Sequence, residues 1–242
     1  MNLLVKVTKR IVDVAGSALA LAVTIPFYPA IAAAIILESP GPVFLRQRRA
    51  GPLISTDPDK PGRCQFQEFS MLKFRTMKVD AEKGTGPVLA TENDPRVTRV
   101  GKFLRRTRLD ELPQFWNVFL GEMSLVGPRP ERPEIISHLA MAIPYFEERM
   151  RDVKPGITGL AQISLSYTGR VPLASEMAPH VASFHNPFRV EGAEDSLADD
   201  LRVKLLYDLA YGVATESFRS FLPLELRIIL KTPLVMIRGA GT

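Results

Sequence analysis

The hydropathy pattern is dominated by a long uncharged run near the amino terminus. Residues 14–37 carry no charged side chain and exceed the roughly 20 apolar residues needed to cross a bilayer. Pro26 and Pro29 fall near the middle of the run, where each removes a helical hydrogen bond and favours a kink. Basic residues lie on both sides of the run, and such flanks favour the cytoplasmic side. A helix that enters the membrane, bends at Pro26 and returns satisfies both observations, with Thr24 as a hydroxyl partner for the freed backbone. A single spanning helix is the alternative.

Beyond residue 40, the apolar positions change between strand-like and helix-like periods. Strands are predicted at residues 43–46, 70–77 and 161–164, and residues 123–126 are short and apolar. Helices are predicted at residues 97–108, 113–120, 135–151 with a break near Pro144, 197–214 and 222–238. Residues 52–63, 84–95 and 169–195 are interpreted as loops. We therefore expect a mixed α+β, helix-rich protein. Residues 1–40 would form the re-entrant membrane helix, and residues 41–242 a compact cytoplasmic domain with small β elements.

Composition narrows the class of partner. The chain has 242 residues and a net charge of +5, which fits a protein that binds anions such as nucleic acid, acidic lipid headgroups or phosphorylated substrates. Cys64 is the sole cysteine, so neither an intrachain disulfide nor a cysteine zinc site can form. The three histidines show no metal-ligand spacing.

The strongest candidate chemistry lies at residues 105–114, which read Arg-Arg-Thr-Arg-Leu-Asp-Glu-Leu-Pro-Gln. Pro113 is suited to a first helical turn, and Gly121 is a plausible helix stop. Asp110 and Glu111 are therefore expected at or just before a helix N-terminus, where anions such as phosphate bind. Carboxylates, arginines and a helix start together indicate a Mg²⁺-assisted phosphoryl site. Ordinary helix capping explains the same acidic residues.

Further basic residues could belong to that site. Lys73 and Arg75 are two apart in a predicted strand and would share one face. Arg129 lies between two prolines in the sequence Gly-Pro-Arg-Pro, which restricts its backbone and holds its side chain in a defined direction. A solvated surface charge or a structural ion pair is the alternative interpretation of each basic residue.

Several motifs occur in order along the chain and carry a resemblance to a known family. They are Lys9-Arg10 with Asp13, SPGPVF at 39–44, KFRTM at 73–77, DPRVTRVGKFLRRTRLDELPQFWNV at 94–118, MSLVGPRP at 123–130, KPGITGLAQ at 154–162, and Asp208 with Tyr211. Together they resemble the bacterial sugar transferases, which are small monotopic polyprenyl-phosphate phosphoglycosyltransferases. The chain departs from the family pattern at Ile25, where a serine usually precedes the membrane proline.

The resemblance implies an enzyme that moves a sugar 1-phosphate from a UDP-sugar to undecaprenyl phosphate and releases UMP. It implies that Asp110 is the nucleophile and forms an aspartyl-phosphosugar, with Glu111 as metal ligand or proton handler and Mg²⁺ as the cofactor held by both. The substrate-binding residues that it implies are Lys73, Arg75, Arg105, Arg129 and Asp208. Pro26 would make the membrane break. The protein would lie on the cytoplasmic face of the bacterial inner membrane, among membrane lipids, at the first membrane step of surface glycan synthesis such as exopolysaccharide or lipopolysaccharide.

Two other functions use the same residues. A membrane-anchored Mg²⁺-dependent phosphatase would use water in place of the lipid acceptor. A membrane-tethered module that binds nucleic acid or acidic lipid would use the basic cluster. Against nucleic acid, Asp110 and Glu111 would repel a phosphate backbone, and aromatic residues are not interleaved with the basic ones. The sequence does not determine the sugar, the glycan pathway or whether the chain forms a homodimer.

Overall fold

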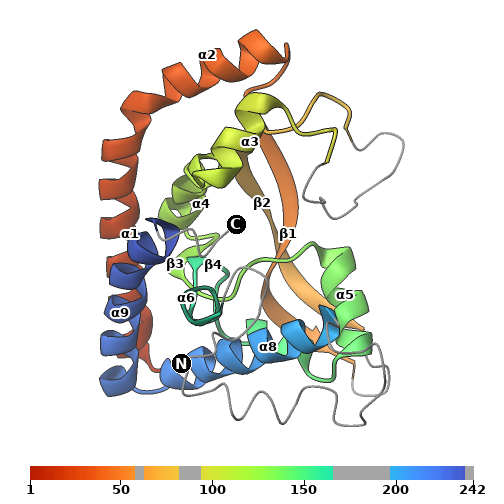
Figure 1. The fold of residues 1–242 in the computed structure, drawn as a ribbon. Helices are drawn as coiled ribbons and strands as arrows, with labels where there is room; N and C mark the ends of the chain where they lie inside the picture. Colours follow the sequence, from red (N-terminus) through yellow and green to blue (C-terminus); the bar gives the residue numbers. More distant parts are fainter. Residues whose placement is uncertain (58–62, 82–93, 166–196, 238–242) are drawn as a thin grey trace.

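The computed structural model describes residues 1–57, 63–81, 94–165 and 197–237. Its first element is helix α1, Leu3–Thr24, which begins where the Asn2 side chain accepts the Leu4 N–H at 3.1 Å. A 3-10 turn, η1 at Ile25–Phe27, contains Pro26 and leads into α2, Tyr28–Glu38. Figure 1 shows the chain changing direction between α1 and α2. The predicted break at Pro26 is therefore confirmed.

The Thr24 hydroxyl donates to the Ala20 carbonyl at 2.7 Å, one turn back along α1. It does not contact the Ala22 carbonyl, which loses its donor at Pro26, so the expected partner for the freed backbone is not the one that Thr24 binds. The continuous segment Leu3–Glu38 is long and apolar enough to cross a membrane, and only 11% of its most apolar window is buried within the protein. A core helix of a water-soluble protein would be mostly buried, and this segment is not.

The largest sheet is an antiparallel hairpin that curves along one side of the molecule (Figure 1). It pairs β1, Phe44–Thr56, with β2, Cys64–Phe74, and Phe44 lies opposite Phe74. The loop predicted at 52–63 is wrong over its first part, because β1 continues to Thr56. Pro52 is accommodated where the register shifts between Ala50 and Leu53, since a bulge tolerates a residue that cannot donate a ladder hydrogen bond.

A second, parallel sheet pairs β3, Ser124–Val126, with β4, Gly156–Thr158. The strand predicted at 161–164 is wrong, because that stretch is helix α6, Leu160–Ser164. The strand lies just before it, in glycine-rich sequence that resembled a turn. A Cβ at Gly156 would lie 2.1 Å from the Gly127 nitrogen, so only glycine permits this close approach. Short strands of this kind carry too few residues to show a period.

The remaining helices agree with the predicted order. They are α3 Arg99–Arg106, η2 Leu109–Glu111, α4 Gln114–Leu120, α5 Pro133–Ala142, η3 Phe146–Met150, α8 Leu197–Ala214 and α9 Phe218–Ile237. Gly121 ends α4 with a φ of +88°, and the break near Pro144 separates α5 from η3. The mixed helix-and-sheet class is confirmed. The loop predicted at 169–195 and most of the one at 84–95 lie outside the described residues.

Buried charges fasten α1 to the rest of the protein. The Lys9 ammonium donates to the Glu225 carboxylate at 2.7 Å, the Tyr211 hydroxyl at 2.8 Å and the Val126 carbonyl at 2.9 Å. The Asp13 carboxylate accepts hydrogen bonds from the hydroxyl of the first β3 residue and the N–H of the second, at 2.9 and 2.8 Å. Since α9 also lies beside α1 (Figure 1), these contacts fix the direction in which α1 leaves the domain.

Candidate functional site

The two candidate carboxylates lie in η2, between α3 and α4. Thr98 caps the start of α3, and Arg108 adopts a left-handed conformation, with a φ of +58°, where the chain leaves that helix. This turn brings Asp110 and Glu111 into the protein, where they are 7% and 9% exposed. The predicted placement of both residues just before a helix start is confirmed.

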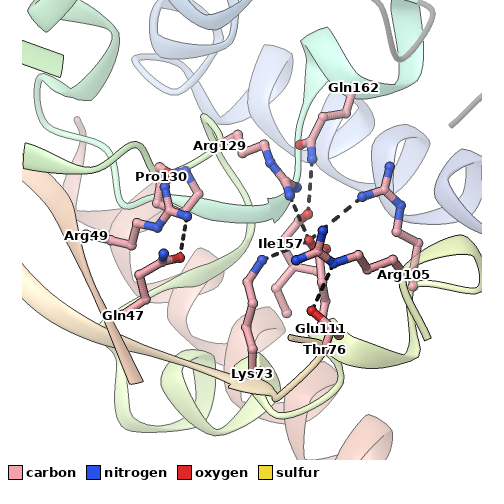
Figure 2. Close-up of polar contacts among 11 residues, drawn as sticks. Gln47, Arg49, Lys73, Thr76, Arg105, Glu111, Arg129, Pro130, Ile157 and Gln162 are labelled. Carbon is pink, nitrogen blue, oxygen red and sulfur yellow. Dashed lines mark hydrogen bonds and ion pairs between the residues drawn. The ribbon is translucent and has the colours of Figure 1, made fainter. Parts of the chain in front are cut away.

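Glu111 is surrounded by cations. Its Oε1 lies 2.7 Å from the Arg129 guanidinium, 3.3 Å from the Lys73 ammonium and 3.9 Å from the Arg108 guanidinium. Figure 2 shows the Lys73 and Arg129 side chains converging on Glu111 from separate elements. Burial alone would raise the pKa of Glu111, but the three positive charges outweigh it and hold that pKa well below its usual range. Glu111 is therefore a permanent anion that gathers the basic side chains.

Asp110 has a different environment from its neighbour. Its Oδ1 is buried and has no hydrogen-bond partner. Burial and the adjacent Glu111 charge raise the pKa of Asp110, opposed by Lys73 and Arg105. A buried carboxylate oxygen without a partner is costly unless a ligand or ion completes it. Asp110 thus keeps a carboxylate oxygen open to a ligand, whereas Glu111 is paired with cations.

The other basic residues near the pair come from β2 and α3. Burial lowers the pKa of Lys73, while Glu111 opposes the shift. The Arg105 Nε donates to the Thr76 hydroxyl at 2.9 Å, and this contact holds the guanidinium in the group drawn in Figure 2. The structure therefore brings Lys73, Arg105 and Arg129 together around the two carboxylates.

The turn that carries Arg129 is braced on both sides. The Gly127 N–H donates to the Thr158 carbonyl at 2.8 Å, and the turn is further held by Arg49, which donates to the Pro130 carbonyl at 3.2 Å. From the opposite side, Arg149 donates to the Arg129 carbonyl at 3.3 Å. The predicted rigid turn therefore aims its arginine at Glu111.

Asp208 does not touch the carboxylate pair in the described contacts. Its Oδ2 accepts a hydrogen bond from the Arg149 Nε at 2.9 Å and forms an ion pair with a terminal nitrogen of the same guanidinium at 2.7 Å, and both side chains are almost fully buried. Burial raises the pKa of Asp208, while Arg149 lowers it. The predicted substrate-binding residue is thus placed behind the site, where it orients the arginine that holds the Arg129 backbone.

Arg75 is likewise placed away from Lys73. Its guanidinium donates to the Ser39 hydroxyl at 3.1 Å and to the Ser39 carbonyl, at the end of α2. The strand ends at Phe74, so the alternation that placed both basic residues on one face does not extend to Arg75. This arginine joins the end of α2 to the start of the hairpin.

Sequence reasoning missed two contributors to the site. Arg108 belonged to the recognised basic cluster, but its left-handed backbone, which turns it toward Glu111, has no signal in the sequence. Arg149 lay in a predicted amphipathic helix, and its partners are 20 and 59 residues away. Contacts over such separations cannot be found from local spacing.

The donor set for a metal is incomplete within the protein. Among the residues that the structure describes, no group of three His, Cys, Asp or Glu side chains could hold an ion. Mg²⁺ is commonly held by one or two carboxylates together with substrate phosphates and water. The unpartnered Oδ1 of Asp110, next to the Glu111 carboxylate, fits such a partial set.

Comparison with known proteins places this site in a family. A 45% identical stretch of 166 residues covers 69% of the chain and 31% of a UDP-glucose:undecaprenyl-phosphate glucose-1-phosphate transferase from Xanthomonas campestris. A putative undecaprenyl-phosphate N-acetylgalactosaminyl 1-phosphate transferase from Bacillus subtilis is 44% identical over 59% of the chain and 72% of its own length. A UDP-N-acetylgalactosamine-undecaprenyl-phosphate N-acetylgalactosaminephosphotransferase from Aeromonas hydrophila is 36% identical over 96% of the chain.

The chain is shorter than two of these relatives, since its match spans 31% of the Xanthomonas protein and 44% of the Aeromonas protein. The family model described as bacterial sugar transferase matches residues 4–239. That match includes residues 4–38 of the apolar segment, the carboxylate pair and the turn of Arg129. The chain belongs to the bacterial sugar transferase family.

Proposed function

We propose that this protein transfers a sugar 1-phosphate from a UDP-sugar to undecaprenyl phosphate through a covalent intermediate on Asp110. The observation that carries the proposal is the pairing of Asp110, a buried carboxylate with an unpartnered oxygen, with Glu111, a carboxylate clamped by three cations. The names of the similar proteins, which act with UDP-sugars and undecaprenyl phosphate, support the choice of donor and acceptor.

In the first step, an oxygen of the Asp110 carboxylate attacks the phosphorus that carries the sugar. The bond from this phosphorus to the bridging oxygen of the diphosphate breaks, and UMP leaves with that oxygen. The product is an aspartyl-phosphosugar. Asp110 needs no general base, because it is an anion once the pH exceeds its raised pKa.

The basic side chains would neutralise the approach of one anion to another. Arg129 and Lys73 share the Glu111 carboxylate, so they are held in place before the substrate arrives. Such preorganised cations stabilise the charge on a transferring phosphoryl group. Glu111 prevents their mutual repulsion from opening the site, and Asp208 acts through Arg149 to fix the Arg129 turn.

Mg²⁺ is the proposed cofactor, with Asp110 and Glu111 as the protein carboxylates that would hold it. When bound, it would neutralise negative charge on the diphosphate. The protein's own residues still orient the donor and supply the nucleophile. EDTA should stop UMP release and added Mg²⁺ should restore it, whereas full activity in a metal-free preparation would contradict this assignment.

In the second step, an oxygen of undecaprenyl phosphate attacks the same phosphorus. The bond between this phosphorus and Asp110 breaks, the carboxylate is restored, and a polyprenyl-diphosphate sugar is formed. We propose that Leu3–Glu38 is a re-entrant helix whose ends both face the cytoplasm. The contacts of Lys9 and Asp13 with the domain would then hold the site at the depth of lipid headgroups.

The direct test incubates the detergent-extracted protein with a panel of UDP-sugars and undecaprenyl phosphate. Release of UMP together with a polyprenyl-diphosphate sugar is the expected result. Free sugar phosphate or inorganic phosphate, formed without lipid product, would instead show a phosphatase. Salt-sensitive RNA or DNA binding that is unchanged in Asp110→Asn, without turnover of any UDP-sugar, would show a binding module.

A further inference from the structure

An open apolar groove lies between α2 and α3. It has a volume of about 820 Å³ and is lined from α2 by residues that include Ala30 and Ala34, and from the other side by Val100, Phe103 and Leu109. Pockets that hold small molecules usually measure roughly 300–1,000 Å³. Figure 1 shows α2 running toward the start of α3, and the lining residues come from both helices.

The two ends of the groove differ. At one end, the Glu38 carboxylate accepts the N–H groups of Arg99 and Val100, each at 2.7 Å, and this cap closes the start of α3. At the other end lies Leu109, which is bonded directly to Asp110. A molecule whose phosphate reaches Asp110 can therefore lay an attached apolar chain along the groove.

Eight of the ten lining residues are apolar, and the charged pair Glu38 and Arg99 lies at the capped end, so the lining favours a long apolar occupant. The alanines on α2 leave the space open, and apolar side chains at its edges remain accessible, with Phe103 53% and Leu37 86% exposed. Because α2 belongs to the segment apolar enough for a bilayer, the groove is continuous with the surface that would meet lipid. Each methylene group buried there would contribute favourably to binding.

We propose that this groove binds the first isoprene units of the polyprenyl phosphate acceptor and guides its phosphate to Asp110. This inference rests on the proposed function, which supplies the acceptor, and adds where its tail is bound. Acceptor recognition then has two parts. The carboxylates and their cations act on the phosphates, and α2 and α3 bind the apolar chain attached to the acceptor phosphate.

The test fills the groove without touching the phosphate site. Ala34→Phe places a ring in the groove, and Ala33→Phe is its matched control, since Ala33 is exposed and is not part of the lining. Ala30→Phe is a second filling variant at an exposed position, where a larger side chain does not enter the core. Thermal unfolding of all three variants verifies that they are folded.

Two reactions are measured for each variant. The first is adduct formation with UDP-sugar alone, and the second is complete transfer at varied undecaprenyl phosphate. Both filling variants should form the adduct as the unmutated protein does, but raise the KM for undecaprenyl phosphate about tenfold, as expected from losing contact with about two methylene groups. Ala33→Phe should change neither reaction by more than about twofold.

A phosphate with a single isoprene unit provides the decisive comparison. Its KM should respond much less to the filling variants, since it has little tail to displace. An equal effect on both acceptors, or an effect of Ala33→Phe equal to that of the filling variants, would overturn the tail-binding groove. Failure of the unmutated protein to form any adduct would instead refute the proposed mechanism on which the groove depends.

Discussion

Removal of the Lys9 ammonium should destabilise the protein far more than removal of an exposed lysine on the same helix. Lys9 is 5% exposed, and its charge is opposed by Glu225, which is fully buried. Lys9→Met leaves that carboxylate without its cation, and breaking a buried pair in this way costs about 3–5 kcal/mol. For a chain of this size, each kcal/mol lowers Tm by about 2–4 °C, so a decrease of about 6–20 °C is expected.

A double variant isolates the pair from other effects of Lys9. Lys9→Met with Glu225→Leu removes both charges, and the Tyr211 hydroxyl can still donate to the Val126 carbonyl at 3.1 Å. A neutral pair of similar volume is often no less stable than the buried ion pair, so the double variant should recover most of the lost Tm. Lys6→Met is the matched control, because Lys6 is exposed on α1, and should change Tm by no more than about 2 °C.

The pH dependence of the Lys9→Met defect has a definite sign. Burial raises the pKa of Glu225, and Lys9 opposes this shift in the unmutated protein. Without Lys9, the pKa should rise further above its unfolded value. The folded variant should then be favoured below that pKa, where Glu225 is protonated, and lose stability as the pH rises through it. Thermal unfolding in detergent at several pH values measures both effects. Equal Tm losses in the single and double variants would refute the inference of a buried anchor.

Three further predictions concern the site and the membrane helix. Asp208→Asn should reduce transfer by weakening the support of Arg129. Adding Arg149→Lys should not restore transfer, since one ammonium cannot reproduce the two guanidinium contacts. Measurement of UMP release, with KM and kcat compared, tests this, and unchanged kinetics would contradict it. Lys73→Met should move the acidic limb of the pH–rate profile for adduct formation to higher pH, because Lys73 lowers the pKa of Asp110; a shift to lower pH would oppose that assignment. Pro26→Leu should straighten the proposed membrane helix and favour a spanning topology. A cysteine introduced at one terminus, after removal of Cys64, should then become accessible to an impermeant label. Unchanged protection of both termini would exclude Pro26 as the determinant of the re-entrant topology.

The parts of the fold that were predictable depend on residues with strong local preferences. Proline at position 26 breaks the apolar helix, and Gly121 ends α4, because each has a backbone constraint that no tertiary contact is needed to reveal. The placement of Asp110 and Glu111 before α4 follows from Pro113 for the same reason. Pro113 and Gly121, together with the charged residues at 105–111, were sufficient to locate the candidate site.

The remaining features depend on contacts between distant segments. Lys73 and Arg75 contact different partners because β2 ends at Phe74, between them, and strand alternation gives no information beyond that point. The three-residue strand β4 forms because glycines allow it to approach β3, a preference that also suits a turn. Asp208 was found through a motif, but its partner Arg149 is 59 residues away, so its position behind the site could not be derived from spacing.

Mass spectrometry of the intact protein after incubation with a UDP-sugar alone tests the central claim most directly. The account predicts a mass increase equal to one sugar phosphate, release of UMP in the same amount, and location of the adduct on Asp110 in a proteolytic fragment. Asp110→Asn should remain folded and show neither product. An adduct of the same mass on Asp110→Asn, or transfer by that variant at the unmutated rate, would contradict the account.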